Sequence, residues 1–330
     1  MSKWFVFVFL FLVFTTTAFA QTPPTTSPTP APTPNQEAER QRQIMERYRR
    51  DETMRRLDNI KSANAIRRPL PASVLYDVKQ LYRGSSSSEL SKLSIDPSDI
   101  NDSRTLLQQK NTGIVRLVPG SNCGDATMVI SADSNCMKYT MPGNGSYYSF
   151  RKGDYSIGRI ADLHFIDNTL RSSGLLQHVL MTGLGDVPIL NVDTTTNGMK
   201  FLIDFAPSKE IATAKQTTKE IFEGINNGGF YYSHQLNLVD NMTYAMRVVA
   251  YRTAMFRSFN GFIYDEADFD KRIDLLVVFR VIRKHDDGSI TMVWKQLDKK
   301  RSPQLKPGKD EKGTLEVNRF MASKSSEKQN

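Results

Sequence analysis

The feature that most constrains the fold is the apolar run Ile273–Ile282, which reads IDLLVVFRVI. A run of this length, rich in β-branched and aromatic residues, is typical of a strand buried on both faces. The turn residues DDGS at 286–289 separate it from a second β-prone run, Ile290–Leu297. We therefore expect a hairpin whose first strand lies at the centre of a sheet.

Short runs of the same kind fill the rest of the body. The β-prone segments are 114–118, 126–131, 137–141, 146–151, 199–205, 230–238 and 242–252. Asn197-Gly198 is a typical hairpin turn and predicts that Met199–Phe205 is a strand. Helices are expected at Ala72–Arg83 and Ser208–Ile225, and a loop at Ser85–Ser88. This pattern predicts an α+β fold, mainly an antiparallel β sandwich or barrel-like body with a few helices.

The N-terminus has the pattern of a cleaved signal peptide over residues 1–20. Lys3 precedes an unbroken apolar run of 11 residues, Trp4–Phe14, and Ala18-Phe19-Ala20 supplies the small residues that a signal peptidase requires. The run is about half the length of roughly 20 residues that a membrane-spanning helix needs. We expect a secreted or periplasmic protein with no transmembrane span after cleavage, with an uncleaved membrane anchor as the alternative.

Five further segments complete the expected organisation. Residues 21–34 are rich in Pro and Thr and predict a disordered, extended spacer. Residues 35–68 predict a charged helix, which either associates with itself or a surface through 35–62 or is simply solvated. A helical and loop lead-in is expected at 69–111, the β-rich domain at 112–298, and a basic disordered tail at 299–330.

The net charge of +9 lies in the flanking segments and not in the body. Residues 1–68 hold 11 basic and 6 acidic residues, and residues 299–330 hold 9 and 4. This leaves 24 basic and 25 acidic residues in 69–298. A basic groove through the folded domain is therefore not indicated, and we expect no specific nucleic-acid partner.

Cys123 and Cys136 are the two cysteines of the chain and lie 13 positions apart. In an oxidising compartment such a pair is expected to form a disulfide, which would stabilise the fold by roughly 3 kcal/mol. A zinc site would need closely spaced ligands such as C-x₂₋₄-C with histidines nearby, and the sequence has none.

The sequence offers one weak catalytic pair and one weak metal site. Asp162 and His164 share a face if they lie in a strand, so the carboxylate could orient the imidazole as a general base, although a solvent-facing pair is the simpler expectation. Four acidic residues could hold a hard cation, although they lack the order of an EF-hand and favour a solvated loop. These are Asp265, Glu266, Asp268 and Asp270.

Two further patterns have structural interpretations. His178 lies in an apolar stretch and is expected to be a structural histidine. Phe150-Arg151 is one of six aromatic–arginine dipeptides and predicts an amphipathic strand with the aromatic ring inside and the arginine outside.

The chain lacks G-x-S-x-G, H-E-x-x-H, P-loop and G-x-G-x-x-G motifs, so no cofactor is expected. The layout of a stalk followed by a domain predicts an exported, non-enzymatic binding protein. Its partner would be another protein or a component of the cell envelope. The alternative is a secreted hydrolase without a short motif, in which Asp162 and His164 would act.

Overall fold

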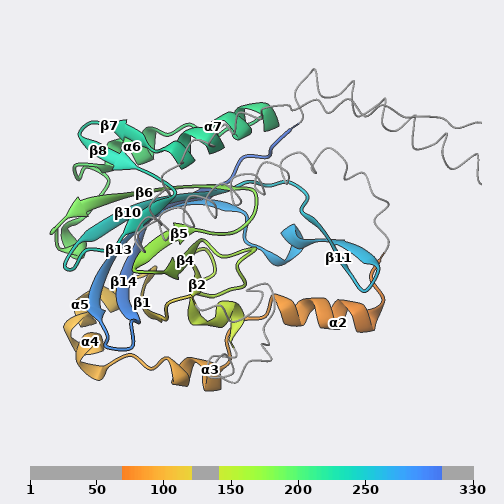
Figure 1. The fold of residues 1–330 in the computed structure, drawn as a ribbon, viewed down its shortest axis with the longest axis horizontal. Coiled ribbons are helices and arrows are strands. Elements are labelled where there is room, and N and C mark those ends of the chain that lie inside the picture. The colour runs from red at the N-terminus through yellow and green to blue at the C-terminus, as the bar shows by residue number, and fades with distance from the viewer. Residues whose placement is uncertain (1–68, 121–140, 307–330) are drawn as a thin grey trace, which may run out of the picture. The chain divides into compact units, whose positions relative to one another are not determined.

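The computed structural model describes residues 69–120 and 141–306 (Figure 1). These residues form a β-rich α+β fold, made mostly of antiparallel sheets with few helices. The predicted signal peptide, spacer, charged helix and cysteine pair lie outside the described residues, as does the tail from residue 307. Within the described residues, no helix is long and apolar enough to cross a membrane.

The larger sheet has five antiparallel strands in the order β1-β14-β13-β10-β6. Their bounds are Thr112–Leu117, Ile290–Arg301, Ile273–Lys284, Thr243–Ala250 and Gln177–Gly185. The prediction of a central strand is confirmed, because β13 is the middle strand and is followed directly by its partner β14. β14 continues to Arg301, so the boundary expected after Asp298 falls inside a strand.

The second sheet also has five antiparallel strands, in the order β3-β2-β4-β5-β9. Their bounds are Asp154–Tyr155, Tyr147–Ser149, Leu163–Ile166, Thr169–Ser172 and Gln235–Asn237. One hydrophobic core contains residues of both sheets, among them Leu163 and Phe165 of β4 with Met246 and Val277 of the larger sheet. The two sheets therefore face one another across this core.

Two small hairpins, six α-helices and three short 3₁₀ helices complete the described fold. The hairpins are β7–β8 and β11–β12, with strands Ile225–Asn227, Phe230–Tyr232, Phe256–Phe259 and Phe262–Asp265. The helices α2 to α7 span Ala72–Leu81, Ser87–Lys92, Pro97–Asp102, Arg104–Leu107, Met199–Asp204 and Ile211–Glu223. The predicted helices at 72–83 and 208–225 are confirmed by α2 and α7.

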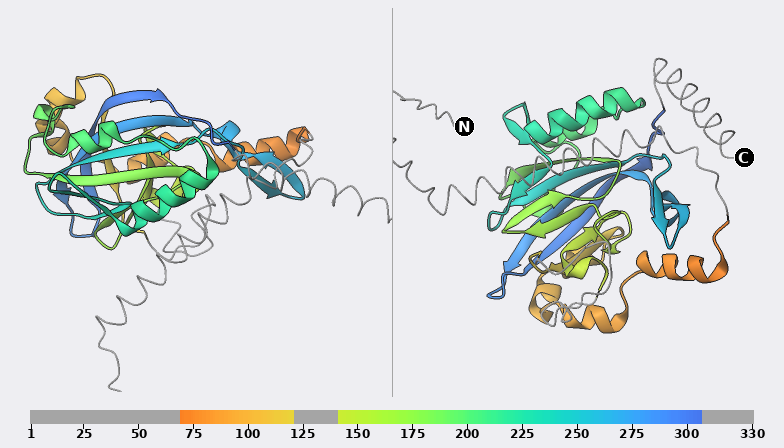
Figure 2. Two further views of the ribbon diagram at one scale, coloured as in Figure 1. Left: turned by 90° about the horizontal axis from the view of Figure 1, so that it is seen from above. Right: turned by 45° about the vertical axis from the view of Figure 1, so that its right-hand side comes forward.

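Helices α6 and α7 pack on the larger sheet (Figure 2). Leu202 of α6 and Ile221 of α7 belong to a second core, which also contains Leu180, Ala245 and Val278 of the sheet. One face of that sheet is thus covered by the second sheet and part of the other by these two helices.

The prediction of a strand at Met199–Phe205 is wrong, because this segment forms α6. Met199 and Leu202, three residues apart, are both fully buried, whereas a strand would direct them to opposite faces. Gly198 has φ +88 and lets the chain turn directly into the helix. The expected loop at Ser85–Ser88 is also partly wrong, since Ser86 caps α3 in a capping box with Glu89.

Candidate functional site

Asp162 and His164 are both buried, so the expectation that they face solvent is wrong. The Asp162 carboxylate accepts hydrogen bonds from Arg151 Nε at 2.5 Å and from the Arg151 backbone N–H at 3.0 Å. The His164 ring stacks on Tyr147, with ring centroids 3.9 Å apart and planes 3° apart. Arg151 therefore binds the Asp162 carboxylate, and the Tyr147 ring packs on the His164 imidazole.

The acidic segment 265–270 is mostly buried, so the expectation of a solvated loop is wrong for three of its four carboxylates. The Asp265 carboxylate accepts from the backbone N–H groups of Met255 and Ala267, at 2.8 and 3.0 Å. The fully buried Glu266 pairs with Arg159. Asp268 alone of the four is exposed.

Asp270 lies between two buried guanidinium groups, Arg151 at 2.7 Å and Arg272 at 2.8 Å. Burial by itself would raise the pKa of Asp270, but these two cations lower it below its usual value. Within the described residues, no group of three or more histidine, cysteine and acidic side chains is placed to hold a metal ion. The segment instead supplies carboxylates to arginines of the body.

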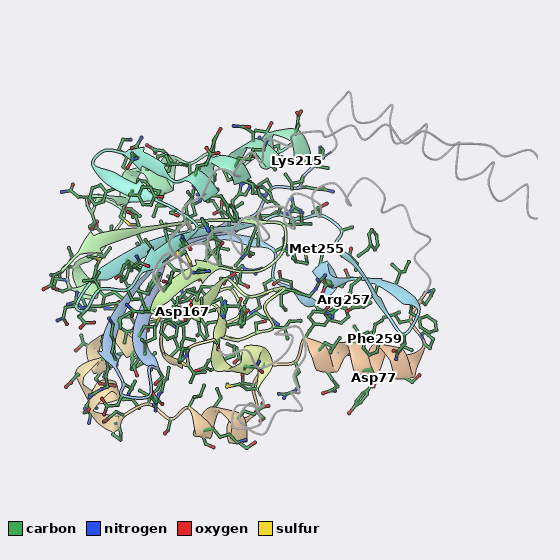
Figure 3. All side chains as sticks on the ribbon, in the orientation of Figure 1. Asp77, Asp167, Lys215, Met255, Arg257 and Phe259 are labelled. Carbon is green, nitrogen blue, oxygen red and sulfur yellow. The ribbon has the colours of Figure 1, made fainter. Side chains whose placement is uncertain are left out.

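Glu266 organises the contact between the β11–β12 hairpin and the end of α2. Arg257 of β11, labelled in Figure 3, lies 3.5 Å from Glu266, and the Tyr82 hydroxyl donates to the same carboxylate at 2.5 Å. Burial and the neighbouring Glu266 charge raise the pKa of Tyr82 far above its usual value. This hydroxyl therefore stays protonated and acts as a donor.

His178 is a structural histidine, as its apolar surroundings predict. Its Nδ1 lies 2.8 Å from the Tyr251 hydroxyl, and its Nε2 lies 3.1 Å from both the Ala214 carbonyl and the Thr218 hydroxyl. Burial lowers the pKa of His178 to about 4, so the ring is neutral at physiological pH. It joins β6 to α7 and to Tyr251, which directly follows β10.

A pocket of about 630 Å³ lies where α6 and α7 end. This volume is in the range of about 300–1,000 Å³ that is common for ligand sites. Its lining comprises Phe201, Asp204, Phe205, Ala206, Glu220, Glu223, Gly224, Ile225 and Asn226. Sequence reasoning missed this pocket because it assigned the α6 segment to a strand, so no helix end was expected beside the end of α7.

Arg247 of β10 fixes the aromatic wall of the pocket. It binds Asp274 through two hydrogen bonds, at 2.9 and 2.7 Å. Its Nη1 donates to the carbonyls of Leu202 and Phe205 at the end of α6, at 2.6 and 2.7 Å. The buried guanidinium thus satisfies the last carbonyls of α6 and holds Phe205 in place.

Three carboxylates also line the pocket. Glu220 and Glu223 lie in the last turn of α7, which contains no basic residue. Acidic side chains at a helix C-terminus oppose the helix dipole, and two like charges three residues apart repel each other. The third carboxylate, Asp204, pairs with Lys200 at the surface at 2.5 Å. The end of α7 therefore carries negative charge that the helix itself does not favour.

A strand edge and an exposed tyrosine border the pocket. Within the described residues, β7 pairs only with β8, and Asn226 and Asn227 are exposed. Tyr231 of β8 is 50% exposed and lies against Gly224, where a Cβ atom would overlap its ring. The pocket is thus continuous with a strand edge that no other described strand pairs with, and with an accessible aromatic side chain.

No match to this chain was found among protein-family models, curated proteins or solved structures.

Proposed function

We propose that the protein is an exported binding protein, with a two-sheet sandwich presented on a proline-rich spacer and a charged helix. Its partner is an extended segment of another protein outside the cytoplasm, and the pocket at the ends of α6 and α7 holds a basic side chain of that segment. The observation that carries the proposal is the pair Glu220 and Glu223, placed beside two phenylalanine rings.

The chemistry of the pocket favours a lysine or arginine side chain. A cation would neutralise the two glutamates that oppose the dipole of α7. The faces of aromatic rings such as Phe201 also attract cations, by about 0.5–1 kcal/mol at exposed sites. A flat guanidinium group can stack on a ring and donate to a carboxylate at once, so arginine fits this lining best.

The expected ion-pair energies are too small for the basic side chain to account for binding by itself. Each exposed carboxylate contributes about 0.2–1 kcal/mol to an ion pair, and a dissociation constant of about 1 mM already requires about 4 kcal/mol. The remaining affinity must come from further contacts. Within the described residues β7 pairs on one side only, so its other edge offers backbone hydrogen bonds to an added strand, a recurring mode of peptide recognition.

The test uses the chain from residue 21 and a capped pentapeptide with a central arginine between threonine and valine residues. A second peptide carries citrulline, which has nearly the shape of arginine without its charge. Titration calorimetry at low salt should show binding of the arginine peptide and much weaker binding of the citrulline peptide. Added salt should weaken binding of the arginine peptide, because salt screens exposed ion pairs.

The double variant Glu220→Gln/Glu223→Gln tests the site itself. Loss of two exposed carboxylates should weaken arginine-peptide binding by about 2- to 30-fold, from roughly 0.2–1 kcal/mol each. The same change should leave the free protein as stable as before or slightly more stable, because the helix dipole is relieved.

Glu210→Gln, at the N-terminal end of the same helix, is the matched control and should bind like the unmodified chain. Equal affinity for both peptides, or equal weakening by the control variant, would contradict the proposal.

A further inference from the structure

A row of four side chains crosses the second sheet. In the strand register, Tyr147 lies opposite His164, His164 opposite Arg171, and Arg171 opposite Gln235. Residues directly opposite one another in a sheet point to the same face. Leu170, the neighbour of Arg171, points into the core between the sheets, so the row lies on the other face.

The turn between β4 and β5 fixes this register. Asp167 and Asn168 both have positive φ, 48° and 55°, as a two-residue hairpin turn of type I′ requires. Asp167 is labelled in Figure 3 at the end of this hairpin. Because the turn sets the pairing of the two strands, His164 and Arg171 are held side by side.

Arg171 differs from the other buried arginines of the described residues. Arg151, Arg247 and Arg272 each pair with a carboxylate. Arg171 is just as inaccessible, with 7% exposure, yet its Nε is buried and has no hydrogen-bond partner. Within the described part of the chain, no carboxylate forms an ion pair with it.

An unpaired buried guanidinium is unfavourable, because the charge loses its hydration and gains no counter-ion. A protonated imidazole beside the guanidinium would add a second positive charge and make the site less favourable still. We propose that Arg171 is the centre of a binding site for an oxyanion, a phosphate or carboxylate group of a small ligand. This site lies on a different sheet from the α6–α7 pocket and is independent of the function proposed for that pocket.

The neighbours of Arg171 have the chemistry that such a ligand requires. The planar guanidinium presents parallel N–H donors that match two oxygens of a phosphate or carboxylate. Amide and imidazole side chains, such as those of Gln235 and His164 beside Arg171, are also groups that bind phosphate and carboxylate by donating hydrogen bonds. The stack of His164 on Tyr147, at 3.9 Å, fixes the imidazole plane. Gly120 passes so close to His164 Nε2 that a Cβ at this position would overlap the imidazole.

The test measures thermal unfolding of the chain from residue 21 in phosphate, acetate or chloride at equal ionic strength. Phosphate or acetate should raise the melting temperature above that in chloride, and the effective anion identifies the ligand group. Arg171→Gln should weaken binding of that anion at least tenfold, and Arg171→Lys less, since lysine keeps the charge without the planar fork. The exposed Arg301→Gln is the matched control and should respond like the unmodified chain.

The stability of the variant in chloride separates a ligand site from a structural ion pair. Arg171→Gln removes a charge without a counter-ion, so its melting temperature in chloride should equal or exceed that of the unmodified chain. A clear loss of stability would show that the guanidinium has a structural partner within the chain itself and would overturn the proposal. Equal melting temperatures in all three salts would overturn it as well.

Discussion

Replacement of Asp270 should cause a large loss of stability. Its side chain is fully buried and lies 2.7 Å from Arg151 and 2.8 Å from Arg272, which are themselves almost inaccessible. Arg151 donates further to the carbonyls of Ile160 and Lys271, at 2.9 and 2.6 Å. Asp270 thus neutralises two buried cations, and Arg151, which follows β2 in the chain, holds Asp270 and Lys271 beside the second sheet.

Asp270→Asn keeps the shape of the side chain and removes its charge. Arg151 and Arg272 then share the single carboxylate of Asp162, which already pairs with Arg151. Breaking a buried ion pair typically costs about 3–5 kcal/mol. For a domain of this size each kcal/mol lowers the melting temperature by about 2–4 °C, so we expect a decrease of roughly 6–20 °C.

Differential scanning calorimetry at pH 7 measures this decrease. The matched control is Asp240→Asn, which breaks a 2.7 Å pair with Lys284 in which the aspartate side chain is 71% exposed. Such a surface pair contributes about 0–1 kcal/mol, so the control should unfold almost as the unmodified chain does. Equal melting temperatures for the two variants would refute the assignment of Asp270 to a buried network.

The pH dependence of Asp270→Asn has a definite sign. The neighbouring guanidinium groups overcome the effect of burial and lower the pKa of Asp270 in the folded state. Its contribution is therefore present above the unfolded pKa of about 3.9 and is lost as the pH falls through the lower folded value. The difference in stability between the unmodified chain and the variant should shrink below about pH 4.

Two other replacements test the described fold. The folded pKa of His178 is about 4, against about 6.5 in the unfolded chain. The free energy of unfolding should therefore fall by about 3 kcal/mol from pH 6.5 to 4. In His178→Gln, the free energy of unfolding measured with urea should change much less over this pH range. A steep profile in the variant would assign the effect to another group. Gly198→Ala places a Cβ 2.8 Å from Phe230 on a backbone with φ +88. It should lower the free energy of unfolding by about 1–3 kcal/mol in the same urea assay. Unchanged stability would contradict the described turn into α6.

The elements that the sequence predicts well are those with strong local signals. β13 is a continuous apolar run followed by a polar turn, and α7 has apolar residues at helical spacing. Such signals need no knowledge of distant contacts. The same holds for His178, since a histidine in an apolar stretch is normally buried and hydrogen-bonded.

The errors arise where distant partners decide the outcome. Phe201, Ile203 and Phe205 alternate as in a strand, yet burial of Leu202 against the larger sheet makes the segment a helix. Phe150-Arg151 predicts a buried ring and an exposed arginine. Both are buried, because Asp270 reaches Arg151 from 119 positions away.

The candidate pocket could not be predicted for a similar reason. Its lining comes from α6, the end of α7 and β7, and α6 is the element that the sequence assigns wrongly. The acidic last turn of α7 is visible in the sequence as Glu220 and Glu223. Only the structure shows that two phenylalanine rings line the same pocket as this turn.

Amide hydrogen exchange of β7 tests the central proposal most directly. The measurement compares the chain from residue 21 alone and with the arginine pentapeptide at a concentration well above its dissociation constant. We predict slower exchange at Ile225–Asn227 and unchanged exchange in β10 and β13, because the peptide adds to the edge of β7 that faces away from β8, beside the pocket. Bound peptide with no protection in β7, or with protection confined to another part of the fold, would contradict it.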